Sequence, residues 1–285
     1  MNITSENIQL QIANLRTDII STLIGAVSGE SEEQAASFAD ILGDKTSALS
    51  ADGRNMSLFD PESGYKMMSK INQYEVDFKA QHAELNAMGD AIEHMEAVAA
   101  HLAEAVDTAT TNTDIAAQLQ SFIDQYNAWE DRFDDTVAQG GVLDNIQAAE
   151  ISLYELEQSV SSLFHGATGP NGGVSGLKDI GITIDPMTKQ ATLDVTQLNS
   201  ALATNKAGVV AAIDEFGAHF AQSADMLNST GNFIQNALDN RSRAIDYIAD
   251  NKSSLHNEFG KGDVSAPTGA TAKALAAYNK TFGLV

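Results

Sequence analysis

The sequence predicts a mainly α-helical protein: an antiparallel helical bundle with long heptad-patterned helices and one small β-hairpin. Three observations predict this class. The 285 residues include only 4 Pro, and aromatic residues make up 6%. Apolar residues recur at helical spacing over several long segments, whereas alternation with a period of two is confined to one short stretch. Since 43% of the residues are hydrophobic, the chain has enough apolar surface to form a core.

The first 60 residues are expected to form an amphipathic helix followed by a flexible linker. From residue 5 to 25, apolar side chains recur on one helical face behind a polar start. They are Ile8, Ile12, Leu15, Ile19 and Leu23. Residues 26–58 are rich in Ser, Gly and Asp, with one short helix expected around residues 32–42.

A long heptad-patterned helix is predicted from about Pro61 to Val106. Asp60 and Pro61 make a good helix start, because Asp accepts orphan N–H groups and Pro has none to leave unpaired. The a positions are Ile71, Phe78, Leu85, Ile92, Ala99 and Val106, and the d positions are Tyr74, Gln81, Met88, Met95, Leu102 and Ala109. This stripe is about 50 Å long at roughly 1.5 Å per residue, so it requires a partner surface.

Further helices follow at short intervals, which favours antiparallel packing. A run of Thr and Asn at residues 110–113 supplies a new helix start, and Gly140 and Gly141 end that helix. Its expected seam is Ile115, Leu119, Phe122, Tyr126, Trp129 and Phe133. A third helix carries Ile146, Leu153, Leu156, Val160 and Leu163, and a loop is expected over residues 166–176.

One segment, residues 177–194, has the pattern of a β-hairpin. Ile180, Ile182 and Ile184 alternate with smaller or polar residues, the Asp185-Pro186 pair turns the chain, and residues 191–193 form the return strand. Asp194 then caps a short helix that carries Leu198 and Leu202.

The chain is expected to end in two longer helices and a tail. The helices span about residues 207–227 and 232–259, the stretch from Gly260 to Gly269 is expected to be loose, and a short helix is predicted near residues 273–282. The predicted organisation is therefore an N-terminal helix and linker at 1–60, a helical bundle with its hairpin at 61–262, and a loose tail at 263–285.

Charge and composition exclude several classes of function. The formal net charge of −23 opposes binding to nucleic acid and to anionic membrane surfaces. Such acidity fits either a solvated surface or a partner with a basic face. No apolar run is long enough to insert into a membrane, and the absence of Cys excludes disulfides and thiol chemistry.

No catalytic, cofactor-binding or metal-binding site is expected. No His follows a Glu at the spacing used by di-iron bundles, and His94 and His101 fall at a solvent-facing heptad position. The carboxylates beside the seams are Glu84, Glu93, Glu96, Asp131 and Asp134, and they fall on polar helix faces. The Gly cluster is neither a dinucleotide fingerprint nor a phosphate-binding loop, and consists of Gly169, Gly172, Gly173 and Gly176. We therefore expect a structural protein, not an enzyme.

Two groups of residues resemble a known family, the flagellar filament cap proteins or hook-associated protein 2. One group lies in the second helix, where the family's "F-V-x-x-Y-N" pattern is matched by Phe122, Tyr126 and Asn127. The other matches "L-x-x-I-G-I", a return strand ending in Asp, and "L-x-x-A-L-x-x-N"; its residues are Leu177, Ile180, Gly181, Ile182, Asp185, Leu193, Asp194, Leu198, Leu202 and Asn205. The resemblance spans roughly residues 114–250.

The resemblance implies a helical leg domain and a role in the bacterial flagellum. Family members usually carry β-rich head domains where this chain has only about six residues, 108–113. We expect a headless structural or assembly protein of the extracellular flagellum, with self-association and with flagellar axial proteins or an export chaperone as partners. The alternative is a cytoplasmic helical adaptor or scaffold derived from the same fold.

Overall fold

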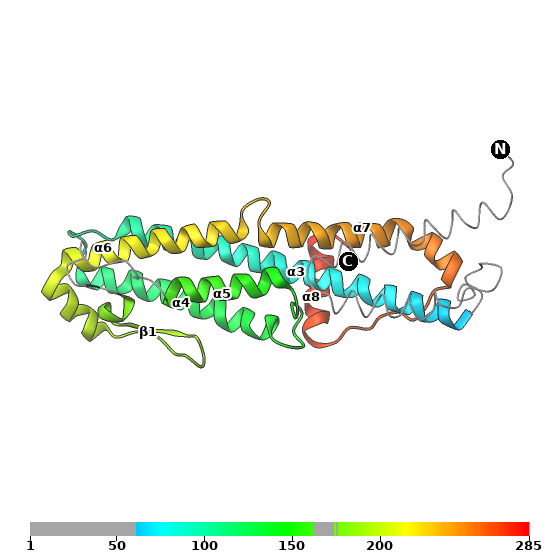
Figure 1. Cartoon of the computed structure of the whole chain (residues 1–285), viewed down its shortest axis with the longest axis horizontal. Helices are drawn as coiled ribbons and strands as arrows, with labels where there is room; N and C mark the ends of the chain where they lie inside the picture. The colour runs from blue at the N-terminus through cyan, green and yellow to red at the C-terminus, as the bar shows by residue number, and fades with distance from the viewer. Residues whose placement is uncertain (1–60, 162–173, 175, 285) are drawn as a thin grey trace, which may run out of the picture. The chain divides into compact units, whose positions relative to one another are not determined.

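The computed structural model describes residues 61–161, 174 and 176–284, and these residues are mostly helical (Figure 1). The elements, in chain order, are α3 (Pro61–Ala105), α4 (Asn112–Val137), α5 (Gln147–Ser161), the 3-10 helix η2 (Leu177–Ile180), β1 (Ile182–Ile184), β2 (Ala191–Leu193), α6 (Val195–Asn228), α7 (Phe233–Phe259) and α8 (Gly269–Thr281). The predicted mainly α class with one hairpin is confirmed. The expected helix at 5–25, the linker at 26–58, and Asp60, Leu163, Gly169, Gly172 and Gly173 lie outside the described residues.

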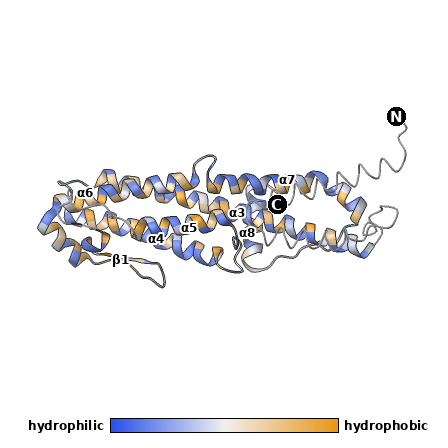
Figure 2. Cartoon of the chain, in the orientation of Figure 1, coloured by the Kyte–Doolittle hydropathy of each residue, from blue (hydrophilic) through white to orange (hydrophobic). Residues whose placement is uncertain are grey.

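The described residues form two compact units. Unit 1 contains residues 61–84 and 238–284, and unit 2 contains residues 85–237. Helices α3 and α7 each contribute residues to both units. Figure 2 shows polar and apolar residues interleaved along every helix, as expected for helices that bury one face and solvate the other.

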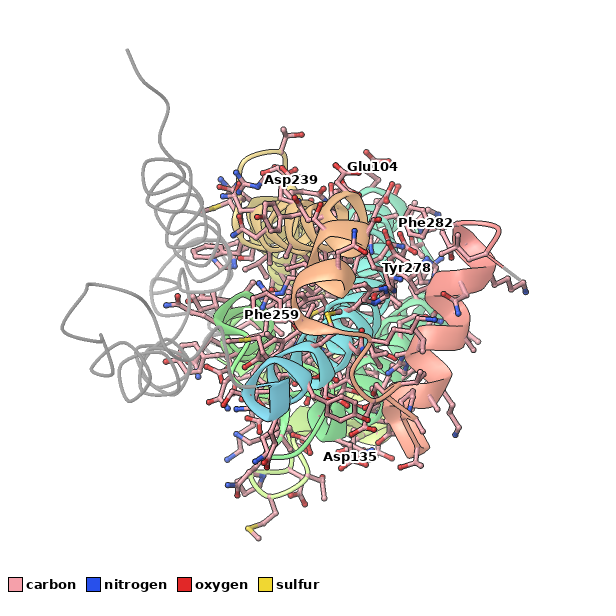
Figure 3. The ribbon with its side chains drawn as sticks, turned by 90° about the vertical axis from the view of Figure 1, so that its right-hand side faces the viewer. Glu104, Asp135, Asp239, Phe259, Tyr278 and Phe282 are labelled. Carbon is pink, nitrogen blue, oxygen red and sulfur yellow. The ribbon has the colours of Figure 1, made fainter. Side chains whose placement is uncertain are left out.

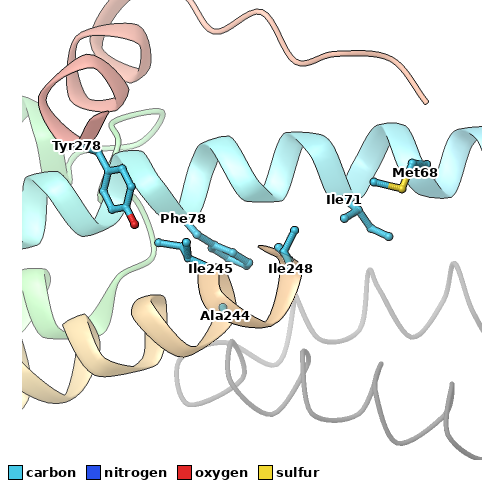
Figure 4. Packing of buried hydrophobic residues seen from close by; sticks show 7 residues of the cluster. All are labelled: Met68, Ile71, Phe78, Ala244, Ile245, Ile248 and Tyr278. Carbon is cyan, nitrogen blue, oxygen red and sulfur yellow. The ribbon is translucent and has the colours of Figure 1, made fainter. Parts of the chain in front are cut away.

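In unit 1, the heptad stripe of α3 packs against α7. Phe78 of α3 lies beside Ile245 and Ile248 of α7 in a buried cluster (Figure 4). The cluster comprises Met68, Ile71, Phe78, Ala244, Ile245, Ile248 and Tyr278. Gln81, the one plainly polar residue of the stripe, accepts a hydrogen bond from Nε of Arg241 at 3.3 Å. Arg241 is only 5% exposed, so its buried guanidinium needs a hydrogen-bond acceptor. Gln81 supplies that acceptor, which an apolar residue at this heptad position could not do.

Residues 260–268 have no regular secondary structure, but they are tied to α3. Asn72 donates from Nδ2 to the carbonyl oxygens of Lys261 and Asp263, at 3.0 and 2.7 Å. The Asp263 N–H donates to Ser69 Oγ at 2.7 Å. Gly262 has φ +63°, and a Cβ there would lie 2.5 Å from the Ser69 nitrogen. The segment predicted to be loose is therefore held by backbone and side-chain hydrogen bonds.

The short C-terminal helix predicted near residues 273–282 is α8, and it packs within unit 1. Tyr278 is buried, and its ring makes an edge contact with His82 at 5.5 Å between centroids. Phe282, one turn further on, makes a second edge contact with His82 at 5.7 Å between centroids. Tyr278 and Phe282 are labelled in Figure 3. Burial lowers the pKa of His82, and the charge of Asp246 opposes that effect. The helix thus has a partner surface within its own chain.

In unit 2, the second half of α3 packs closely against α6. The stripe residues of this half are buried: Leu85, Met88, Ile92, Met95, Ala99, Leu102 and Val106. Gly217 of α6 sits so close to α3 that a Cβ would lie 2.5 Å from the carbonyl oxygen of Ala99. Small residues at this crossing therefore let the two backbones approach each other.

Helices α4 and α5 also bury one face each. All six predicted seam residues of α4 are buried. On α5, Leu156 and Val160 are buried as predicted, but Leu153 is only half-buried. Ser152 and Ser159 are buried in its place, and Ser152 Oγ donates to the Ala148 carbonyl at 2.8 Å. The prediction that Leu153 belongs to the buried seam was wrong, because the face of α5 that packs against the core includes small residues, Ser152 and Ser159.

The link between α3 and α4 is a tight, capped turn. Asp107 Oδ1 accepts from the N–H groups of Ala109 and Thr110, at 2.8 and 2.7 Å. Thr111 is the N-cap of α4 and accepts from the Asp114 N–H at 3.1 Å, which confirms the predicted helix start. Ala109, which was assigned to the heptad, is exposed in this turn because α3 ends at Ala105.

We predict that Gly217→Ala destabilises the protein by about 1–3 kcal/mol, because the added methyl group overpacks the crossing of α6 with α3. The free energy of unfolding from urea denaturation measures this cost. Gly64→Ala is the matched control: a Cβ there has its nearest neighbours at 3.5 Å, so the change stabilises α3 by up to about 1 kcal/mol. Equal stability of the two variants would contradict the close approach.

Candidate functional site

The two groups of motif residues lie together in unit 2, on α4, the hairpin and the start of α6. Figure 1 shows the hairpin beside these helices. The buried members are Phe122, Tyr126, Leu177, Ile180, Gly181, Ile182, Leu198 and Leu202; Asn127, Leu193 and Asn205 are half-buried; Asp185 and Asp194 are exposed. The motif residues therefore form one structural unit, which we call the hairpin site.

Asn127 holds the hairpin to α4 through both atoms of its side-chain amide. Its Nδ2 donates to the Ala191 carbonyl at 2.9 Å, and its Oδ1 accepts from the Ala191 N–H at 2.7 Å. The side-chain amide thus pairs with the Ala191 backbone as a neighbouring strand would, on the edge of β2 that does not pair with β1. One turn further along α4, Asp131 accepts from Nε2 of Gln190 at 2.6 Å. Asn127 and Asp131 thus form a polar row that fixes the position of β2.

The hairpin has the predicted register and turn. Ile182 pairs with Leu193, Thr183 with Thr192, and Ile184 with Ala191, all antiparallel. Asp185 Oδ1 accepts from the N–H groups of Met187 and Thr188, at 2.7 and 3.0 Å. These hydrogen bonds, that of Thr188 first, lower the pKa of Asp185. The turn is therefore ordered by the Asp of the Asp-Pro pair.

Gly181 and Asp194 close the base of the hairpin. Gly181 has φ +90°, and a Cβ there would lie 2.6 Å from the Asp194 carbonyl oxygen. Asp194 donates its N–H to the Gly181 carbonyl at 2.7 Å and caps α6 by accepting from Thr196 and Gln197. The "L-x-x-I" part of the motif was assigned to a strand, but Leu177–Ile180 is a 3-10 helix, since Gly181 reverses the chain before β1 begins.

Asn205 marks a kink inside α6. Its φ of −153° and ψ of 73° are not helical, and its Oδ1 accepts from the Gly208 N–H at 3.0 Å. The side chain therefore caps the second part of the helix. This explains why the sequence predicts two helices, ending near Leu202 and starting near Ala207, where the structure has one continuous element.

Phe122 anchors the site to the core of unit 2. Its ring makes edge contacts with Phe216 and Phe220 of α6, with centroid distances of 4.8 and 5.1 Å. Such T-shaped pairs contribute about 0.5–1.5 kcal/mol beyond the area they bury. The aromatic part of the motif is thus a packing anchor, and the polar part holds the hairpin.

Glu130 is a buried carboxyl group for which no burial or role was predicted from the sequence. Its side chain is 2% exposed, and Oε1 has no hydrogen-bond partner among the described residues. Burial raises the pKa of Glu130 to about 7; the nearby Tyr126 hydroxyl opposes this, and the charges of Glu157 and Asp134 add to it. The spacing of Glu130 from Tyr126 and Phe133, four and three residues away, could have placed it on the buried seam.

Charged groups elsewhere do not converge. In the described part of the chain, no group of three or more His, Asp and Glu is placed to hold a metal ion. His94, His101, Glu93, Asp131 and Asp134 are exposed, and Glu84 and Glu96 are half-buried. Gly176, of the Gly cluster, is in an extended conformation before η2. Among the described helices, none has the length and apolar character needed to cross a membrane.

A family model described as "Flagellar hook-associated protein 2 C-terminus" matches residues 92–261, more than half of the chain. The chain belongs to this family. The match confirms the resemblance to the hook-associated protein 2 family, and the thirteen motif residues lie within the matched range. Among proteins of curated function, none matches the chain significantly.

A solved relative is the flagellar cap protein FliD from Escherichia coli, crystallised as its D1-D2-D3 domains. It is 21% identical, with a TM-score of 0.40, over 46% of this chain and 37% of that structure. The chain thus corresponds to just over a third of the cap protein fragment. At this level of similarity the structure adds nothing to the family assignment.

In this member of the hook-associated protein 2 family, Asn127→Asp is predicted to loosen the hairpin. The carboxylate cannot donate to the Ala191 carbonyl and repels it, so we expect a loss of about 1–3 kcal/mol in stability. Hydrogen exchange of the Ala191 amide should accelerate more than that of buried helical amides. Asn199→Asp, at an exposed position of α6, is the control and should leave Ala191 protected.

Glu130→Gln is predicted to change how the stability of this family member depends on pH. A carboxyl whose pKa is raised in the folded state stabilises the fold below its ordinary pKa of 4.5, and that contribution is lost as the pH rises through about 7. The variant should therefore match the wild type near pH 4 and exceed it by up to about 3 kcal/mol near pH 8, by roughly 1.4 kcal/mol per pKa unit.

Urea denaturation at several pH values measures this difference. Glu93→Gln, at an exposed position of α3, is the control and should give the same difference from the wild type at every pH. A Glu130→Gln variant that is less stable than the wild type near pH 8 would contradict a carboxyl whose burial raises its pKa.

Proposed function

We propose that this protein is a structural or assembly component of the bacterial flagellum. The observation that supports the proposal is the match of residues 92–261 to the hook-associated protein 2 family, a range that contains the hairpin site in which Asn127 binds Ala191. No catalytic step is needed for such a role. The protein acts by presenting helical surfaces to other proteins.

We further propose that the protein works without a head domain in the region where cap proteins usually carry one. The chain passes from α3 to α4 through residues 106–111, and the turn is closed by Asp107, Thr110 and the N-cap Thr111. Lys206 of α6 also donates to the Thr110 carbonyl. Because hydrogen bonds hold this turn at both ends, it supports the proposal that α3 and α4 are joined directly, without an inserted head domain.

The proposed partners are further copies of this chain and flagellar axial proteins, with an export chaperone before assembly. The chain has a formal net charge of −23, so a partner with basic residues at its contact face is favoured. The proposed location is extracellular, on the flagellum.

Deletion of the gene, followed by complementation, tests the proposal. The protein should be detected by immunoblot in sheared flagellar or secreted fractions, and the deletion should alter flagellar length or motility. Complementation with Glu93→Gln, an exposed substitution, should restore the wild-type phenotype and serves as the control. Unchanged flagella together with a protein found only inside the cell would overturn the proposal and favour a cytoplasmic adaptor or scaffold.

A further inference from the structure

Three polar atoms on one stretch of α4 are buried without hydrogen-bond partners in the described part of the chain. They are the Tyr126 hydroxyl, Nε1 of Trp129 and Oε1 of Glu130. Leaving a buried polar group without a partner costs about 1–3 kcal/mol, and more for a charged group, so the packing around Glu130 is sensitive to the charge of its carboxyl. Of the three residues, Glu130 is the one that can change its charge near neutral pH.

Glu130 lies among the contacts that attach the hairpin. It follows Asn127 by three residues on α4, so it is close to the row of Asn127 and Asp131 that binds β2. On its other side is α5, whose Glu157 accepts from Nζ of Lys189, in the hairpin turn, at 3.2 Å. The buried carboxyl is therefore flanked by the contacts of the hairpin with both helices.

The charges around Glu130 favour its neutral form. The groups that face it are Glu157 on α5, Asp134 one turn along α4, the Tyr126 hydroxyl, and Lys189 in the hairpin turn. Within the described ranges, Lys189 is the only cationic group among them, and its ammonium group is already in contact with Glu157. An ionised Glu130 would thus place a buried negative charge beside the half-buried Glu157 and compete with it for the same lysine.

We propose that Glu130 is a proton-operated lock for the β-hairpin: with the carboxyl protonated the hairpin is closed on α4 and α5, and ionisation opens it. The ionised carboxylate has the Tyr126 hydroxyl nearby, but Glu157 repels it, and Glu157 also holds Lys189. In the proposed open state the hairpin turn moves away from Glu157, so that Lys189 or water can reach Glu130. Opening exposes the Ala191 backbone groups that Asn127 holds, and with them an edge of β2.

The amide of Ala191 provides the most direct test, because it donates to Asn127 when the hairpin is closed. Its hydrogen-exchange protection factor, corrected for intrinsic base catalysis, should fall by about tenfold or more in the full-length wild type between about pH 5 and about pH 8. Glu130→Gln should stay protected throughout. The amide of Phe220, in the core of α6, should change less than that of Ala191 in the wild type.

A second variant keeps the test decisive if Glu130→Gln folds poorly. Glu157→Gln removes the neighbouring negative charge and releases Lys189 for Glu130, so ionisation becomes easier. Fluorescence of Trp129, the single Trp of the chain, should titrate in the wild type, and its midpoint should move to lower pH in Glu157→Gln.

Two results would overturn the proposal. One is an Ala191 protection factor that does not depend on pH in the wild type, or that falls equally in Glu130→Gln. The other is a fall in protection that is the same for Ala191 and Phe220, because such a change would report global unfolding instead of an opening of the hairpin.

Discussion

The burial of the α3 stripe is the constraint on which the rest of the structure depends. A stripe of large apolar residues about 50 Å long cannot face water, since each buried side chain contributes about 1.5–3 kcal/mol. In unit 1 the stripe is covered by α7 and α8, and in unit 2 α6 lies against it at Gly217. The close approach at Gly217 and the polar pair of Gln81 and Arg241 fix how the neighbouring helices meet it.

The hairpin site depends on that helical frame in a specific way. Phe122 places α4 against α6, and Asn127 on the same helix then binds β2 through its amide. The base of the hairpin is closed by Gly181 and Asp194, and the kink within α6 is capped by Asn205. None of these three residues adds an apolar side chain to the core. The motif residues of this chain thus have structural roles: the apolar ones position the helices, and the polar ones position the hairpin and cap the helices.

Much of this could be predicted from the sequence, because helical periodicity, caps and turn residues are local signals. The heptads of α3, the seam of α4, the cap at Asp194 and the hairpin follow directly from such patterns. Contacts between distant residues could not be predicted, as no local pattern encodes them. The Asn127 clamp joins residues 64 apart, the tie of Asn72 to residues 261 and 263 crosses about 190 positions, and the burial of Glu130 depends on the whole of unit 2.

The central claim is that the α3 stripe is covered by helices of the same chain. The most direct measurement is an isotope-filtered NOE experiment on a mixture of labelled and unlabelled protein, which separates contacts within a chain from contacts between copies. We predict intramolecular NOEs from the methyl group of Ala103 to the Hα atoms of Gly217. If these NOEs arose only between labelled and unlabelled chains, the stripe would be buried by association of separate chains, which would contradict its coverage by helices of the same chain.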